Sequence, residues 1–136
     1  MKTFLDSNVL LAGWKGQETD ALAAIQIMED NRRQFFSSEM VKLELLPKAV
    51  FFKNHQEIKF YNEHFSKAKI EPLSPRLSLD AFNLATKYGL AAADALNIAA
   101  AIRQGVQEFI TDERPGKPMF RVTEIKVVPL HAAASL

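Results

Sequence analysis

The chain has 136 residues, 48% of them hydrophobic and 24% charged, with a formal net charge of +1. These values are typical of a globular protein and exclude a disordered or fibrous chain, so we expect one domain over residues 1–136. The absence of cysteine excludes disulfides, zinc-thiolate sites and thiol nucleophiles. The sequence has neither the pattern of a secretory signal nor a run of about 18 apolar residues. We therefore expect a soluble, cytoplasmic protein without membrane association.

The first half of the chain reads as alternating strands and helices. Pro47 lies inside a helical pattern and is expected to kink or break it, because proline lacks a backbone N–H. The expected elements are a strand at 2–5, a helix at 8–14 capped by Ser7, a helix capped by Thr19 or Asp20, a strand at 34–37 and a helix from Ser38.

The second half continues the alternation. The expected elements are a helix at 56–67, a strand at 68–71, a helix capped by Ser78 and stopped by Gly89, an apolar helix at 90–103, a strand at 108–111, a loop at 114–120 and a strand at 124–130. This order predicts an α/β fold, a three-layer α/β/α sandwich around a parallel sheet of four to five strands. Ligands of such sheets bind beyond the carboxyl ends of the strands, where Asp6 and Asp112 both emerge.

Asp94 is the acid whose surroundings are hardest to explain without a function. From Leu90 to Ile102, the only other polar side chain is Asn97, so the helix should be buried. A buried carboxylate needs a compensating partner, and Asn97 shares its face of the helix. The alternative is that the helix starts late and Asp94 caps it.

Three further acids have both a functional and an ordinary interpretation. Asp6 could be a helix N-cap, although Ser7 is an equally good cap. Glu44 could form an exposed ion pair with Lys48, four residues further on. Asp112 could be a turn residue, with Glu113 as a solvated neighbour. As a set, acids within or beside apolar runs instead suggest bound cations.

The remaining polar residues give no catalytic pattern. The histidines His55, His64 and His131 lack the spacing of a triad or a metal triplet, and we expect them on the surface. The five scattered glycines form no phosphate-binding loop. The acids to which no chemistry is assigned are Glu18, Asp20, Glu29, Asp30, Glu39, Glu57, Glu63, Glu71, Asp80, Glu108 and Glu124.

Four stretches, 4–10, 38–46, 89–101 and 109–112, resemble the PIN domain, a family of small metal-dependent ribonucleases. The first and third stretches are specific, and the second and fourth are weak. The resemblance extends over essentially the whole chain and implies a single PIN-like nuclease domain.

The resemblance implies an acidic pocket that holds Mg²⁺ or Mn²⁺, formed by Asp6, Glu44, Asp94 and Asp112. The loop 112–118 departs from the usual ending of the family motif, so Glu113 stays open as the alternative fourth acid. One or two hard divalent cations supply what phosphodiester hydrolysis needs, an activated water and stabilisation of phosphate charge. The expected supporting residues are Ser7, Asn8, Thr111 and Asn97.

The expected function is a divalent-metal endoribonuclease acting on RNA. A chain of this length most resembles the VapC-like toxin of a type II toxin-antitoxin pair, which usually dimerises and is blocked by a cognate antitoxin protein. The alternatives are an inactive PIN-like module that binds RNA or protein, a deoxyribonuclease, and a processing nuclease that is not a toxin.

Two sets of side chains are candidates for partner contacts. The apolar candidates for a dimer or antitoxin groove, each with core packing as the alternative, are Phe51, Phe52, Ile58, Tyr61 and Phe65. The basic candidates for RNA phosphates, each with an ordinary solvated charge as the alternative, are Lys48, Lys53, Arg114, Lys117 and Arg121.

Overall fold

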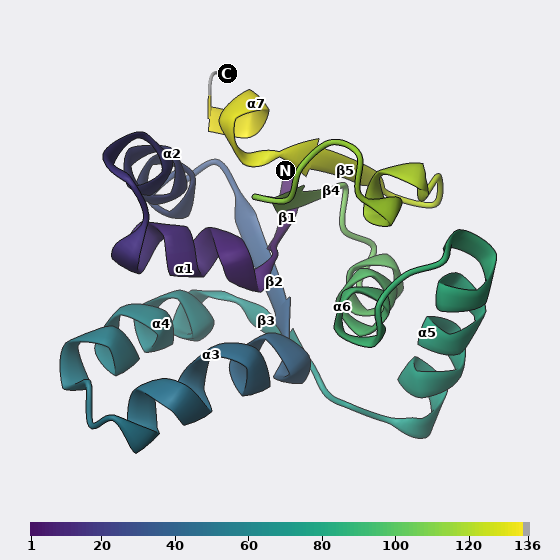
Figure 1. Ribbon diagram of the computed structural model, residues 1–136, viewed down its shortest axis with the longest axis horizontal. Coiled ribbons are helices and arrows are strands. Elements are labelled where there is room, and N and C mark those ends of the chain that lie inside the picture. Colours follow the sequence, from purple (N-terminus) through teal and green to yellow (C-terminus); the bar gives the residue numbers. More distant parts are fainter. Residues whose placement is uncertain (135–136) are drawn as a thin grey trace.

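A computed structural model describes residues 1–134, so the last two residues of the predicted domain, 135 and 136, lie outside the described part. Its centre is a parallel five-stranded sheet with the order β3-β2-β1-β4-β5 (Figure 1). The strands are β1 (Lys2–Leu5), β2 (Gln34–Ser38), β3 (Lys69–Glu71), β4 (Glu108–Thr111) and β5 (Lys126–Pro129). The predicted parallel α/β fold is confirmed.

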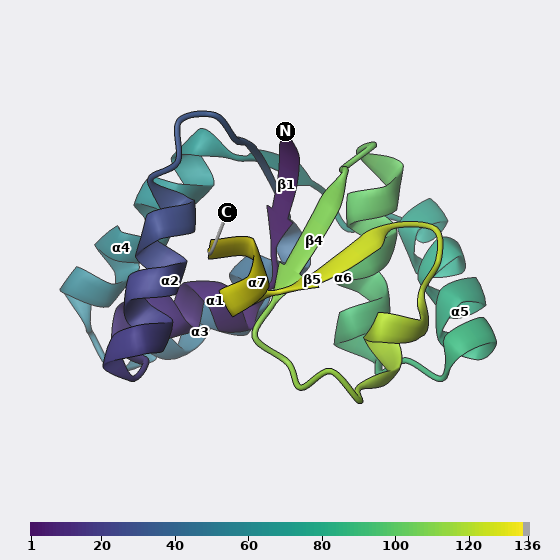
Figure 2. The same cartoon turned by 90° about the horizontal axis from the view of Figure 1, so that it is seen from above.

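Helices cover both faces of this sheet. Figures 1 and 2 show the sheet between α1 to α4 on one side and α5 and α6 on the other. The helices are α1 (Ser7–Lys15), α2 (Glu18–Met28), α3 (Glu39–Phe51), α4 (His55–Lys67), α5 (Pro75–Tyr88), α6 (Ala92–Arg103) and α7 (Leu130–Ala134), with a short 3₁₀ turn η1 (Pro118–Arg121). Across residues 1–134, every helix is too short or too polar to traverse a lipid bilayer.

The core is centred on the two middle strands. Phe4 of β1 stacks on Phe109 of β4, with ring centroids 5.2 Å apart, and both side chains are fully buried. Strands covered on both faces bury nearly every side chain, and in β1 and β4 this includes the polar residues Thr3, Glu108 and Thr111. The alanines of α6 let this helix approach the sheet closely, as its buried Ala99 and Ala100 show.

Two helix starts differ from the predictions because of capping. Asp6 is the N-cap of α1, as its ordinary interpretation predicted, and Ser7 is not; the Asp6 carboxylate accepts a hydrogen bond from the Ser7 backbone N–H. Ser74, rather than Ser78, caps α5, followed by Pro75 at the first helical position. Proline is favoured there because its missing N–H would have no partner in the helix.

Other element limits also differ. Pro47 neither ends nor interrupts α3, which continues to Phe51 because Val41, Leu45 and Ala49 form a buried stripe along it. Helix α2 begins after Gln17, two or three residues before the predicted caps. The predicted loop 114–120 contains most of η1. The strand predicted at 124–130 is β5, which ends at Pro129, and α7 begins at Leu130. Helix α7 was not predicted because its five residues are too few to show a helical periodicity.

The prediction that all three histidines lie on the surface is wrong for His64. This side chain in α4 is only 3% exposed and packs against the rings of Phe35 and Phe65. Burial lowers the pKa of His64 from 6.5 to about 4, and the nearby charge of Lys67 adds to this effect. The folded chain therefore holds His64 neutral at neutral pH.

We expect His64→Leu to remove part of the acid sensitivity of folding. Between pH 6.5 and 4 the unfolded chain protonates His64 while the folded chain does not, so the wild type loses up to about 3 kcal/mol of stability as the pH falls. Urea unfolding at pH 7 and pH 4.5 measures this difference. His55→Leu, at an exposed position in the same helix, is the control and should keep the wild-type pH dependence. An unchanged pH dependence in His64→Leu would contradict the prediction.

Candidate acidic centre

The sheet brings Asp6 beside Thr111. Strands β1 and β4 are parallel neighbours with Leu5 opposite Ile110, and the Asp6 backbone N–H donates to the Ile110 carbonyl at 2.9 Å. The Thr111 hydroxyl then donates to Asp6 Oδ2 at 2.8 Å, while the Ser7 N–H donates to Oδ1 at 2.9 Å. Asp6 is only 4% exposed, so both of its carboxylate oxygens are held in a buried position.

Glu44 is held by a residue of another helix. Asn97 of α6 is fully buried and donates from Nδ2 to Glu44 Oε1 at 2.8 Å. Its Oδ1 accepts from the Ser38 hydroxyl at 2.7 Å, and Ser38 also caps α3 by accepting from the Val41 N–H. Asn97 thus fixes Glu44 relative to the start of α3 rather than pairing with Asp94. An ion pair between Glu44 and Lys48 is not among the contacts of the described residues.

Asp94 lies in the first turn of α6 and is half-buried. The N-cap is Ala91, so the predicted alternative of Asp94 as the cap does not hold. Burial raises the pKa of Asp94, and the negative charge of Glu113 raises it further, while Lys117 acts in the opposite direction. The aligned peptide dipoles favour an anion at this end of a helix.

The pKa of Asp6 shows that Asp6, Glu44 and Asp94 interact through their charges. Burial raises the pKa of Asp6 from 3.8 to about 7 against the opposing hydrogen bond from Thr111, and the charges of Asp94 and Glu44 contribute to the rise. Burial also raises the pKa of Glu44, against hydrogen bonds from Asn97 and Ser7. Within residues 1–134, the ion pairs of lysine and arginine involve other acids. We call Asp6, Glu44 and Asp94 the acidic centre.

The donor set of the acidic centre fits a hard divalent cation. Its three carboxylates offer only oxygen ligands, they repel one another, and no basic side chain forms an ion pair with them in the described chain. Mg²⁺ and Mn²⁺ prefer such oxygen ligands. The ligand atoms do not converge within 4.8 Å of one another, a separation that mutual repulsion favours.

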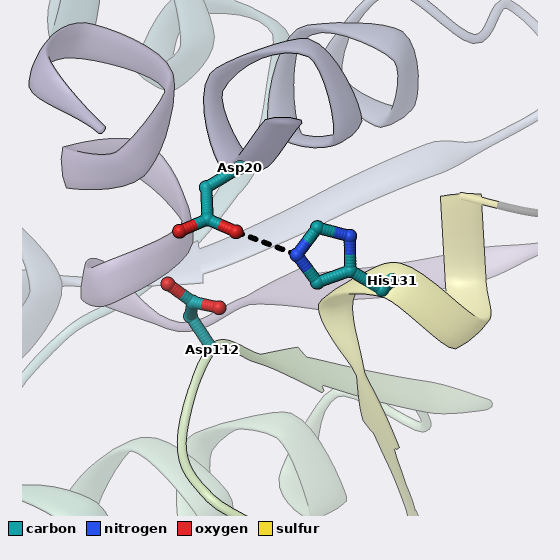
Figure 3. Close-up of side chains that lie close together, drawn as sticks. All are labelled: Asp20, Asp112 and His131. Atoms are coloured by element: carbon teal, nitrogen blue, oxygen red, sulfur yellow. Dashed lines mark hydrogen bonds and ion pairs between the residues drawn. The ribbon is translucent and has the colours of Figure 1, made fainter. Parts of the chain in front are cut away.

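Asp112 lies apart from the acidic centre. Its carboxylate faces Asp20 and His131, and one ligand atom from each of these residues lies within 4.8 Å of the other two (Figure 3). The side chain that acts on Asp94 at this end of β4 is Glu113. Glu113 acts electrostatically on both Asp94 and Asp112, whereas Asp112 is not among the charges that shift the pKa of Asp6, Glu44 or Asp94.

The predicted supporting residues form one network. Asn8 donates from Nδ2 to Thr111 Oγ1 at 3.3 Å, and its Oδ1 accepts from the Asp112 backbone N–H at 3.0 Å. Ser7 forms a side-chain hydrogen bond that lowers the pKa of Glu44. Sequence reasoning missed the link from Asn97 to Ser38 and the group around His131, because both join distant segments. A serine at the end of a buried strand was the one available signal for Ser38.

These observations define a small parallel α/β domain with acids gathered beyond the carboxyl ends of its central strands. The family model described as the PIN domain matches residues 3–119. The chain belongs to the PIN-domain family. PIN domains of the toxin type are nucleases, and PIN nucleases generally use a divalent metal. No curated protein matches the chain in sequence.

Solved structures share the fold at low sequence identity. VapBC2 from Rickettsia felis, bound to a DNA fragment from its promoter, is 17% identical with a TM-score of 0.70, covering 95% of this chain and 98% of that chain. FitAcB from Neisseria gonorrhoeae is 18% identical with a TM-score of 0.67, covering 95% and 98%. A toxin-antitoxin complex from Klebsiella pneumoniae is 20% identical with a TM-score of 0.65, covering 91% and 98%.

Proposed function

We propose that the chain is a Mg²⁺- or Mn²⁺-dependent endoribonuclease that works as one PIN-like domain over residues 1–136. The observation that carries the proposal is Asp6, a buried carboxylate whose pKa is raised to about 7 by burial and by Asp94 and Glu44, against the hydrogen bond from Thr111. A bound divalent cation would offset this charge. Without a bound cation, the buried charge of Asp6 lowers the free energy of unfolding at neutral pH.

The residues of the centre have distinct roles in this proposal. Asp6, Glu44 and Asp94 supply the carboxylate oxygens, and Glu113 is the fourth acid. Thr111 and the Ser7 backbone hold Asp6, and Asn97 holds one oxygen of Glu44. A divalent cation bound there would lower the pKa of an attacking water and stabilise negative charge on the phosphate. The other oxygens of the half-exposed acids stay accessible to a phosphodiester.

The surface beside Glu44 supports a polyanionic substrate. A hollow that includes Glu44 is also lined by Lys15, Lys48 and the exposed ring of Phe52. Lysines neutralise phosphates, and an exposed aromatic ring stacks with unpaired bases, as single-stranded RNA requires. Lys117 adds positive potential close to Asp94. The remaining basic candidates, Lys53, Arg114 and Arg121, are exposed.

We also propose that the chain is the toxin of a toxin-antitoxin pair, bound by an antitoxin protein and able to form a homodimer. Two solved structures with this fold are described as toxin-antitoxin complexes or VapBC assemblies, which supports the proposal. A shallow apolar surface on α3 includes Leu43, Val50 and Phe51, which are 54%, 57% and 78% exposed. Of the apolar candidates, Tyr61 and Phe65 are instead buried in the core.

Cleavage of mixed RNA by the purified chain tests the enzymatic proposal. The wild type should cut RNA with Mn²⁺ or Mg²⁺ and lose activity in EDTA, while Asp6→Asn and Asp94→Asn should reduce the rate by at least about a hundredfold. Asp80→Asn, on the outer helix α5, is the matched control and should cut normally. Equal residual cleavage by wild type and both centre variants would favour the inactive binding module. Preferential cutting of DNA would favour the deoxyribonuclease.

Expression in a bacterium tests the toxin proposal separately. The wild type should arrest growth, and Asp94→Asn should relieve the arrest without lowering the amount of protein. Active RNA cleavage without growth arrest would favour a processing nuclease.

The fourth acid gives a specific prediction. Because Glu113 acts on Asp94 while Asp112 faces Asp20 and His131, Glu113→Gln should lower RNA cleavage by about tenfold or more, and Asp112→Asn should lower it less. Initial rates at one fixed Mn²⁺ concentration compare the two variants directly. A larger loss in Asp112→Asn than in Glu113→Gln would reverse the assignment.

A further inference from the structure

A second group of metal-ligand side chains lies apart from the acidic centre. Asp20 stands in the first turn of α2, Asp112 directly follows β4, and His131 belongs to α7. Figure 3 shows the three side chains pointing toward one another, and a ligand atom from each lies within 4.8 Å of the other two. Asp20 and His131 are separated by 111 positions in the sequence, so the tertiary fold creates this group.

The chemistry of this group differs from that of the acidic centre. It combines two carboxylates with one imidazole, and His131 Nε2 hydrogen-bonds Asp20 Oδ1. A single imidazole, even when protonated, compensates only one of the two negative charges. The Asp112 carboxylate accepts no hydrogen bond from the described residues, and the ion pairs of lysine and arginine there involve other acids. One charge therefore remains uncompensated.

The backbone around the group is already fixed. The Asp112 N–H donates to Asn8 Oδ1 at 3.0 Å, and this hydrogen bond fixes the position of the Asp112 backbone. Asp20 is half-buried, whereas Asp112 and His131 are exposed. An ion could therefore enter from solvent and keep water as a further ligand, as an open site requires.

We propose that Asp20, Asp112 and His131 bind a divalent transition-metal ion, with Zn²⁺ as the representative. One imidazole nitrogen with two carboxylate oxygens suits Zn²⁺, Co²⁺ or Ni²⁺, whereas Mg²⁺ prefers oxygen ligands alone. Binding requires the three ligand atoms to move to about 2.0–2.2 Å from the ion. The ion binds a neutral imidazole whose coordinating nitrogen carries no proton: a protonated His131 releases its Nε2 proton to solvent, and a neutral one keeps its single proton on Nδ1.

The bound ion would join three elements. It would tie α7 to the start of α2 and to the end of β4, and so raise the stability of the folded chain. This inference does not depend on the nuclease activity, because none of its ligands is an acid of the acidic centre.

Zinc binding to the full chain tests the proposal. The double variant Asp6→Asn/Asp94→Asn serves as the background, so that the acidic centre does not contribute metal. Titration calorimetry with ZnCl₂ at pH 7.5 should give one bound ion per chain, and thermal unfolding should shift upward with Zn²⁺. Adding Asp20→Asn or His131→Gln should weaken binding at least about tenfold and abolish the thermal shift.

Matched controls separate the site from general surface binding. Asp80→Asn and His55→Gln, added to the same background, should leave the zinc affinity unchanged, because both residues lie elsewhere. Circular dichroism checks that each variant is folded before titration. No zinc binding, equal affinity in all variants, or binding of Mg²⁺ as tight as that of Zn²⁺ would each overturn the proposal and leave the three residues as an ion pair with a neighbouring acid.

Discussion

Asp6→Asn should abolish RNA cleavage and at the same time stabilise the metal-free chain. The wild type carries a carboxylate whose folded pKa is about 7 and whose ordinary value is 3.8, so the folded chain binds the extra proton between these values. Stability therefore falls as the pH rises from about 4 to 7, and the full cost persists above pH 7. The linkage corresponds to at most about 4 kcal/mol.

The net gain is smaller than this limit because the variant weakens one contact. The carboxylate accepts from both the Ser7 N–H and the Thr111 hydroxyl, whereas asparagine has one carbonyl oxygen and can accept from only one of them, and a buried donor left unpaired costs about 1–3 kcal/mol. Asparagine caps helices as well as aspartate, so the cap of α1 is kept. We expect a net stabilisation of about 1–3 kcal/mol.

Urea unfolding in EDTA at pH 8.5 measures this gain. Asp30→Asn is the opposite control, because the hydrogen bonds from Arg32 lower the pKa of Asp30 to about 2 and its charge is favourable in the folded chain. That variant should show no stabilisation. If Asp6→Asn is less stable than the wild type at pH 8.5 without metal, the charge of Asp6 does not destabilise the folded chain, and the prediction is wrong.

Asn97→Leu should have the second large effect, on both folding and metal binding. Asn97 is fully buried, accepts from Ser38 and donates to Glu44, so leucine leaves both polar groups without this partner. We expect a loss of about 2–4 kcal/mol, since an unpaired buried polar group costs about 1–3 kcal/mol beyond the lost bonds. The freed Glu44 should raise the Mn²⁺ concentration for half-maximal cleavage about tenfold or more.

Two measurements distinguish this positioning role from simple destabilisation. Urea unfolding gives the stability, and the Mn²⁺ dependence of cleavage, at a temperature where the variant remains folded, gives the metal response. Asn62→Leu, at an exposed position of α4, should change neither. A variant that is destabilised yet keeps the wild-type Mn²⁺ dependence would show that Asn97 supports only the fold.

The fold was predictable because its signals are local. Short apolar runs alternate with helical patterns, and that order predicts a parallel sheet with helices on both faces. The cap of α5 was misplaced because Ser74 and Ser78 are equally good caps by type, and only Pro75 distinguishes them. His64 was misplaced because a single polar residue on an apolar helix face does not reveal its burial.

Some of the acids of the site were predictable because their signals are also local in the sequence. Asp6 and Asp94 stand in apolar surroundings that a charge does not normally occupy. The choice between Asp112 and Glu113 depends on the direction in which the chain leaves β4, which the hydrogen bond from the Asp112 N–H to Asn8 helps to set. That bond spans 104 positions, so no local pattern contains it.

The central claim is that Asp6, Glu44 and Asp94 share a divalent cation. Thermal unfolding of the EDTA-treated chain in increasing Mg²⁺ tests it without relying on activity, because an ion that binds only the folded state raises the unfolding temperature. We predict that Mg²⁺ raises the unfolding temperature of the wild type and of Asp80→Asn but not that of Asp94→Asn. An equal rise in Asp94→Asn would contradict the account.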